Sequence, residues 1–156
     1  MLRTDHVSWT GRYYRAVDAR NLPGCVQQPR VPFLMAANGP RSIGLAARFG
    51  DAWVTTGTPS DDLDAWWRGV GDGSRRLDDA LAAAGRDPGT VPRFVSLDAA
   101  GVYALSSVGY LADAAGRAGE LGFTDVVTHW PRPDGPYAGR ESVLEAAAAE
   151  LLRRRG

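Results

Sequence analysis

Lysine is absent from the 156 residues, and all eighteen basic residues are arginine. Eighteen acidic residues balance them, so the formal net charge is zero and the isoelectric point is about 6.7. This balance argues against nucleic acid or an anionic membrane surface as a partner. Cysteine occurs once, at Cys25, which excludes an intramolecular disulfide and favours a reducing compartment.

Long apolar runs and several functional motifs are also missing. The opening stretch MLRTDHVSWTG has no apolar segment of the signal-peptide type, and no run approaches membrane-spanning length. We therefore expect a cytoplasmic protein with no membrane partner. The chain has no HExxH, no paired cysteines and no close cluster of histidine and carboxylate, so we expect no metal site. A GxSxG nucleophile elbow is absent as well.

What is present is an alternation of short apolar runs with helix-like stretches. Runs at 31–37, 51–57, 93–98 and 123–130 predict four strands, of which the first is typical of a strand buried on both faces and the second is also expected to be buried. Helices are expected from Pro40 to near Gly50, from an N-cap at Ser60 to Gly85, within 107–121, and from about 140. The second helix should break at GVGDGS, residues 69–74, because glycine disfavours helix.

Residues 7–18 precede these units and predict a small β-hairpin around Thr10-Gly11. We divide the chain into a hairpin with a linker, 1–30, and four βα units, 31–156, within a single domain overall. Alternating strands and helices predict an α/β fold with a parallel sheet and right-handed crossovers. Four units can form a small open sheet or half of an eight-stranded barrel, and composition does not choose between them.

The turn Asn38-Gly39-Pro40 joins an apolar strand directly to a helix. Such a turn leaves unpaired amides and the positive end of the helix dipole at the carboxyl edge of the sheet, which suits a phosphate. Gly39 lets the backbone approach a ligand closely. The alternative is a tight turn without a ligand. Thr55, Thr56 and Gly57 end the next strand at the same edge, either as anion ligands or because threonine suits strands.

Three further candidates follow later strands. His129 and Trp130 end the fourth run, and a histidine there can donate or accept a proton, although the following proline-rich loop is an equal reason for its presence. Asp98 ends the third run and is a weaker candidate. We expect His6 to lie on the surface, and Trp66 and Trp67 to be packing residues.

Several segments, taken in their order along the chain, resemble the luciferase-like monooxygenase family. These are the flavin- or deazaflavin-dependent oxidoreductases of the bacterial luciferase type. The segments are the hairpin GRYY, the link QQPRVP, the strand and turn AANGP, the helix end AARFGDAW, and ELGFTDVVTHWPRP near the carboxyl terminus. The resemblance implies a (β/α)8 barrel about twice this length. The four strands would be its fifth to eighth, and the hairpin an insertion before them.

By this resemblance, the cofactor is coenzyme F-420 (F420 below) or FMN. The amides of Ala37, Asn38 and Gly39 would hold its phosphate, with Thr55, Thr56 and Gly57 beside it. His129 and Trp130 would face a small-molecule substrate. From their places at strand ends, we expect His129 to be catalytic and Asp98 to lie on the substrate side as well.

Half a barrel leaves open strand edges, so we expect a homo-oligomer or pairing with a missing amino-terminal half. Two alternatives stay open. One is a catalytically inactive half-barrel that binds an anion or self-associates. The other is a four-stranded α/β binding domain unrelated to the barrel.

Overall fold

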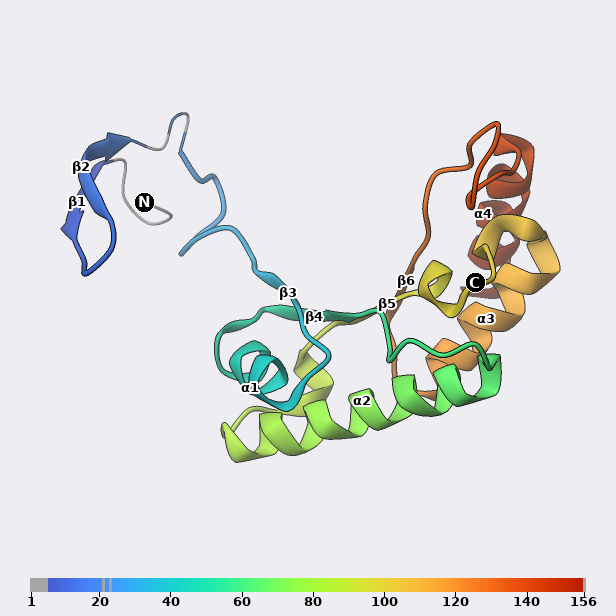
Figure 1. Cartoon of the computed structure of the whole chain (residues 1–156), viewed down its shortest axis with the longest axis horizontal. Helices are drawn as coiled ribbons and strands as arrows, with labels where there is room; N and C mark the ends of the chain where they lie inside the picture. Colours follow the sequence, from blue (N-terminus) through green and yellow to red (C-terminus); the bar gives the residue numbers. More distant parts are fainter. Residues whose placement is uncertain (1–5, 21, 23, 156) are drawn as a thin grey trace. The chain divides into compact units, whose positions relative to one another are not determined.

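The computed structural model describes residues 6–20, 22 and 24–155. The chain divides between Phe33 and Leu34 into two compact units (Figure 1). Residues 1–5, on which the signal-peptide argument partly rests, lie outside the described residues. Each unit is considered separately.

The first unit contains a two-stranded antiparallel hairpin, which confirms the expected turn. Strand β1 (His6–Thr10) pairs with β2 (Arg15–Arg20), and the amide of Gly11 donates to the carbonyl of Tyr14 at 2.9 Å. The side chain of His6 is 49% exposed and contacts Asp18 at 2.5 Å, so its predicted surface position is correct.

The second unit is an α/β fold with one parallel sheet in the order β3-β4-β5-β6. Its elements are β3 (Leu34–Ala36), α1 (Pro40–Phe49), β4 (Ala52–Thr55), α2 (Leu63–Ala83), η1 (Pro88–Thr90), β5 (Arg93–Ser96), η2 (Leu97–Ala100), η3 (Ala104–Ser106), α3 (Val108–Glu120), β6 (Asp125–Val127) and α4 (Glu141–Arg155). The strand-helix order is the one that the apolar runs predict. Figure 1 shows α1 and α2 side by side along the sheet, with α3 next to α4.

One face of the sheet packs against the helices and forms the core. Trp53 and Val95 are fully buried on this face, and Trp53 stacks on Phe123 with the ring centroids 5.6 Å apart. Trp66 is also fully buried and Trp67 is 4% exposed, which confirms both as packing residues. Ile43 of α1 and Leu77 of α2 complete this layer.

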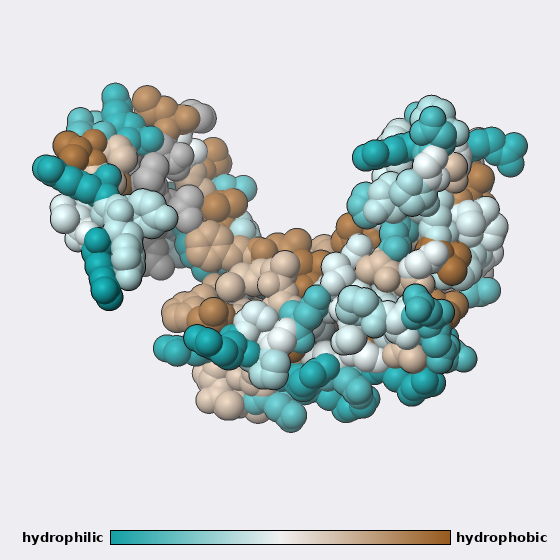
Figure 2. Space-filling model, in the orientation of Figure 1, coloured by the Kyte–Doolittle hydropathy of each residue, from teal (hydrophilic) through white to brown (hydrophobic). Residues whose placement is uncertain are grey.

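The other face of the sheet is not covered to the same extent by the described residues. On the two outer strands, Leu34 is 50% exposed and Val127 is 40% exposed; Val54 and Phe94, which pair with each other on the two central strands, are half-buried. In Figure 2, hydrophobic residues gather above α1 and α2. Figure 1 draws β3 and β4 at this place. The expectation of burial on both faces is therefore wrong for the first strand, because the described part of the second unit places its helices over one face only.

Helix α2 runs unbroken through the GVGDGS segment, so the predicted break is wrong. Gly71 and Gly73 are buried, and a Cβ at Gly73 would lie 3.6 Å from the ring of Trp53. Packing of the helix on this large ring offsets the low helix propensity of glycine, about 1 kcal/mol per residue. The N-cap is Asp62, whose carboxylate accepts from the amide of Asp64, and Ser60 instead caps the turn before it.

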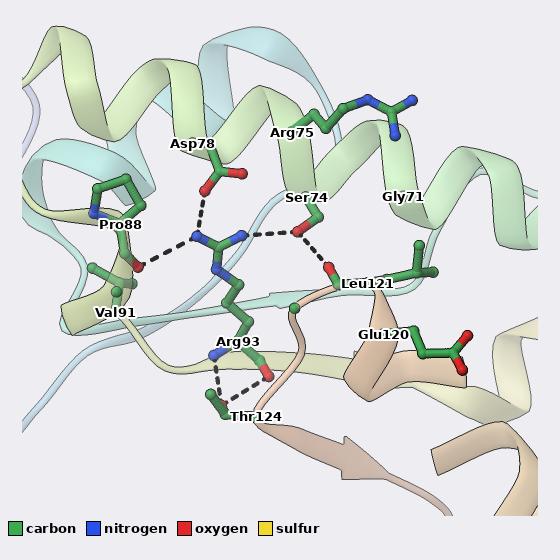
Figure 3. Close-up of a pocket in the computed structure, with 12 residues that line it drawn as sticks. Gly71, Ser74, Arg75, Asp78, Pro88, Val91, Arg93, Glu120, Leu121 and Thr124 are labelled. Atoms are coloured by element: carbon green, nitrogen blue, oxygen red, sulfur yellow. Dashed lines mark hydrogen bonds and ion pairs between the residues drawn. The ribbon is translucent and has the colours of Figure 1, made fainter. Parts of the chain in front are cut away.

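A hollow lies at the amino-terminal end of β5, and Arg93 links the elements that surround it (Figure 3). The buried guanidinium donates to Ser74 Oγ at 2.8 Å, to Asp78 Oδ1 at 2.5 Å and to the carbonyl of Pro88 at 3.3 Å. Ser74 in turn donates to the carbonyl of Leu121. The guanidinium donors are used by α2 and η1, and Ser74 extends the network to Leu121 in the turn before β6, so we regard this arrangement as a structural clamp.

In the part of the chain that the structure describes, no helix is long and apolar enough to cross a membrane.

Candidate functional site

The sequence-predicted site residues follow the carboxyl ends of the four parallel strands. Neighbouring strands in a parallel sheet end side by side, so residues after β3 meet those after β4, and residues after β5 meet those after β6. The structure confirms both neighbourhoods through side-chain contacts. We call them the threonine turn, around Asn38 and Thr55, and the aspartate-histidine pair, Asp98 and His129.

In the threonine turn, the side chain of Asn38 bridges the two threonines. Thr55 Oγ1 donates to Asn38 Oδ1 at 2.6 Å, and Asn38 Nδ2 donates to Thr56 Oγ1 at 2.9 Å. Thr55 is 4% exposed and also accepts from the amide of Gly57 at 3.0 Å. The Thr55 hydroxyl is therefore occupied by the protein, whereas Thr56 is exposed and keeps its hydroxyl hydrogen for another acceptor.

Two of the backbone amides predicted to hold a phosphate already have partners. The Ala37 amide donates to the carbonyl of Val54 at 3.0 Å, and its carbonyl accepts from Trp53 Nε1. The Gly39 amide donates to Ser42 Oγ at 3.2 Å. The first helical bond is from Ile43 to Gly39, so the amides of Arg41 and Ser42 precede it and lack an intrahelical acceptor.

Gly57 shapes the end of β4. Its φ is +69°, and a Cβ there would lie 2.7 Å from Trp66 Nε1. That indole nitrogen donates to the carbonyl of Thr56 at 3.0 Å, which anchors the strand end on α2. A glycine is required here because a side chain would overlap the tryptophan.

The aspartate-histidine pair has a fully buried carboxylate. The Asp98 side chain is 1% exposed, and it accepts from the amide of Ala104 at 2.8 Å and from Thr128 Oγ1 at 3.0 Å. It also contacts the amide of His129 at 2.6 Å and the ring Nδ1 at 2.8 Å. Sequence analysis predicts Asp98 and His129 as two separate candidates, and in the structure their side chains are in hydrogen-bond contact.

Aromatic residues hold the His129 ring and backbone. The ring stacks on Tyr137, with centroids 3.9 Å apart and planes 9° apart. Tyr103 donates its hydroxyl to the carbonyl of His129 at 2.9 Å. Partial burial, and then the negative charge of Asp98, raise the pKa of Tyr103 above its ordinary value of 10.0, so this hydroxyl keeps its proton to a higher pH than an ordinary tyrosine does. Trp130, the next residue, is 62% exposed.

Sequence reasoning missed Ser42, Arg41 and Tyr137. The capping pattern of a hydroxyl three residues after Gly39 could have revealed Ser42. Arg41 is exposed in the first turn of α1, directly after the candidate anion site. Tyr137 sits in the proline-rich loop, and no local pattern connects it to His129.

Neither neighbourhood contains a metal site, since no group of three histidine, cysteine or acidic residues suited to a metal occurs among the described residues.

Comparison with protein families gives a match to the model of the luciferase-like monooxygenases over residues 1–100. This range includes the threonine turn and Asp98. A curated relative, the F420-dependent hydroxymycolic acid dehydrogenase of Mycobacterium tuberculosis, is 32% identical over 96 residues. That match covers 60% of this chain and 23% of the dehydrogenase.

Among solved structures, an F420-dependent secondary alcohol dehydrogenase in complex with an F420-acetone adduct is similar with a TM-score of 0.52 and 13% identity. The similarity covers 78% of this chain and 49% of the dehydrogenase. Monooxygenase RslO1 from Streptomyces bottropensis gives a TM-score of 0.48 at 22% identity, over 98% of this chain and 39% of that one. The matches thus cover less than half the length of each of these three proteins.

Proposed function

The chain belongs to the luciferase-like monooxygenase family, and we propose that it is the carboxyl-terminal half of an F420-dependent oxidoreductase. The observation that carries the proposal is the interlocked threonine turn, where Asn38 joins Thr55 and Thr56 beside the amino terminus of α1. The F420 dependence named for the Mycobacterium tuberculosis relative favours F420 over FMN. FMN remains the second cofactor candidate.

The residues of the turn suit the phosphate of either cofactor. The first-turn amides of Arg41 and Ser42, the Thr56 hydroxyl and the Arg41 guanidinium are donors, and the segments 37–42 and 55–58 contain no carboxylate. Asn38 and Gly39 would line the phosphate, while Ala37, Thr55 and Gly57 would hold the turn in shape. A bound F420 supplies hydride-transfer chemistry, and the protein orients it.

Titration of the chain with F420, FMN and riboflavin tests the phosphate site. Riboflavin has the ring of FMN without the phosphate, so we expect it to bind at least tenfold more weakly than FMN. Thr56→Val should weaken F420 and FMN and leave riboflavin unchanged, and Thr58→Val, an exposed threonine on the same loop, is the matched control. Equal binding of FMN and riboflavin would contradict a phosphate site at this turn.

We further propose that the sheet is half of a (β/α)8 barrel, with the hairpin as an insertion before its fifth strand. The exposure of Leu34 and Val127 supports this, since these apolar residues sit on the strand face that a closed barrel would bury. An apolar hollow of about 570 Å³ also opens beside β6, lined by Phe123 and Val126 and by residues of α3 and α4. The occupant we propose is the amino-terminal half of such a barrel, because the solved dehydrogenase chain is matched over 49% of its length.

Supplying an amino-terminal half from a family member tests this pairing. The complex should form with one copy of each half, and F420-dependent turnover should appear only in the complex. Leu34→Glu with Val127→Glu should prevent pairing, whereas Leu45→Glu, at an exposed position of α1 outside both the sheet face and the hollow, should not. If the double variant pairs as well as the unchanged chain, the uncovered face is not the interface.

The same exposed face favours a second candidate, an inactive half-barrel that self-associates. Light scattering on the chain alone distinguishes this candidate from the pairing of two halves. The second candidate predicts a dimer of the chain that does not bind an added amino-terminal half and shows no turnover.

A further inference from the structure

We propose that Asp98 and His129 form a proton-transfer site at the carboxyl edge of the sheet, with Nε2 of His129 as the atom that exchanges a proton with a substrate oxygen. Asp98 is the positioning residue that directs this nitrogen outward. The inference deepens the proposed oxidoreductase function and rests on it for the substrate. The arrangement of the pair itself comes from the contacts of the described residues.

The tautomer of His129 follows from its partner. An ionised carboxylate can only accept hydrogen bonds, and Asp98 Oδ2 lies 2.8 Å from Nδ1. The Nδ1 atom therefore carries the hydrogen in the neutral ring, and Nε2 keeps its lone pair. Among the described residues Nε2 has no hydrogen-bond partner, and the His129 side chain is 45% exposed.

The ring contact is not needed to hold the loop. Asp98 already fixes the chain after β6 through the backbone amide of His129 at 2.6 Å and the Thr128 hydroxyl at 3.0 Å. A glutamine or a leucine at position 129 would keep that amide bond. The additional bond to Nδ1 determines which ring nitrogen faces away from Asp98, which is what a proton-transfer role requires.

The ring is also fixed in orientation. Tyr137 covers one of its faces at 3.9 Å, and Tyr103 holds the backbone carbonyl of the same residue. The guanidinium of Arg132 lies over the Tyr137 ring, 5.7 Å from its centroid. One nitrogen with a free lone pair is thus presented at an edge that also ends β3 and β4, where the threonine turn lies.

In the proposed step, a substrate carbon bearing a hydroxyl gives a hydride, with its two electrons, to the hydride-accepting cofactor. The hydroxyl proton passes to Nε2, and the carbon-oxygen bond becomes a carbonyl. The resulting imidazolium is stabilised by the buried Asp98 carboxylate, and the reverse step returns the proton to the oxygen.

Nitrogen-15 NMR of the histidine rings in the chain tests the pair without any cofactor. His6 is the only other histidine, so His6→Asn leaves one ring to observe. We expect the neutral His129 ring to carry its hydrogen on Nδ1. Asp98→Asn should reduce that tautomer, and Asp113→Asn, an exposed aspartate on α3, should leave it unchanged. A ring that carries its hydrogen mainly on Nε2 would overturn the proposal.

A second measurement separates this proposal from the proposed function. In the complex with an amino-terminal half, His129→Gln should lower the turnover rate at least a hundredfold while the affinity for F420 stays within twofold. Unchanged turnover with normal F420 binding refutes the proton-transfer site alone. Absence of F420 binding and turnover in the unchanged complex refutes the proposed function, while the NMR result still decides the geometry of the pair.

Discussion

The hydroxyl of Thr55 donates to the side-chain oxygen of Asn38 at 2.6 Å, so side chains as well as the sheet join the ends of β3 and β4. The same oxygen of Thr55 accepts from the amide of Gly57. Thr55→Val keeps the shape of the side chain and leaves both partners without this bond. We expect the free energy of unfolding to fall by about 1–3 kcal/mol, because the buried amide of Gly57 loses its acceptor.

Urea denaturation measures the effect of Thr55→Val, and Thr58→Val is the control because Thr58 is exposed. Equal stability of the two variants would show that the interlocked turn contributes nothing to the fold.

Gly57 and Gly85 form a matched pair for a second prediction. Both have a φ of +69°, but a Cβ at Gly57 would overlap Trp66, whereas one at Gly85 would meet nothing within 4 Å. Gly85→Ala should therefore cost only the left-handed backbone strain, about 1–2 kcal/mol. Gly57→Ala should cost more and move the indole. Thermal denaturation and tryptophan fluorescence test this, and equal losses would contradict the overlap.

The clamp around Arg93 gives a third prediction. Asp78→Ala removes one partner of a guanidinium whose side chain is 9% exposed, and we expect a loss of about 2 kcal/mol, typical of a hydrogen bond to a charged group. Asp79→Ala, at the neighbouring exposed position of α2, should change stability by less than about 0.5 kcal/mol. Chemical denaturation in low and moderate salt compares them. A loss that Asp79→Ala reproduces would argue against the clamp.

The raised pKa of Tyr103 predicts a loss of stability in alkali. Burial and the charge of Asp98 raise this pKa in the folded chain, so above the ordinary value of 10.0 the folded state holds more protons than the unfolded state. Stability is therefore fully present below pH 10 and falls as the pH rises through the folded pKa. Burial and Asp98 act in the same direction on the pKa of Tyr110.

Denaturation curves at pH 8 and pH 10.5 test this dependence. Tyr103→Phe should show a smaller decrease between the two conditions, and Tyr13→Phe, in the exposed hairpin turn, should behave like the unchanged chain. An unaltered decrease in Tyr103→Phe would assign the alkaline effect to other groups.

Local sequence predicted much of the fold because strands and helices differ in their apolar spacing. The four apolar runs and the Pro40 helix start all correspond to elements of the second unit. The runs were longer than the strands, however, because residues such as Asp98 leave the sheet and turn toward neighbouring loops. Helix α2 differs from the prediction in the other direction, because it is longer than either of the two pieces that a break would leave. Its glycines predict a break, but packing against Trp53 keeps the helix continuous.

The sequence by itself determined the strand-helix order, the family, and the edge at which the candidate residues gather. That edge follows from chain direction alone, because parallel strands share one carboxyl end. Only the tertiary structure decided which side chains meet there and which face stays open. Asp98 and His129 are 31 positions apart, and their bond depends on the register of β5 with β6. Such long-range contacts, like the missing cover over Leu34 and Val127, leave no pattern in the local order of residues.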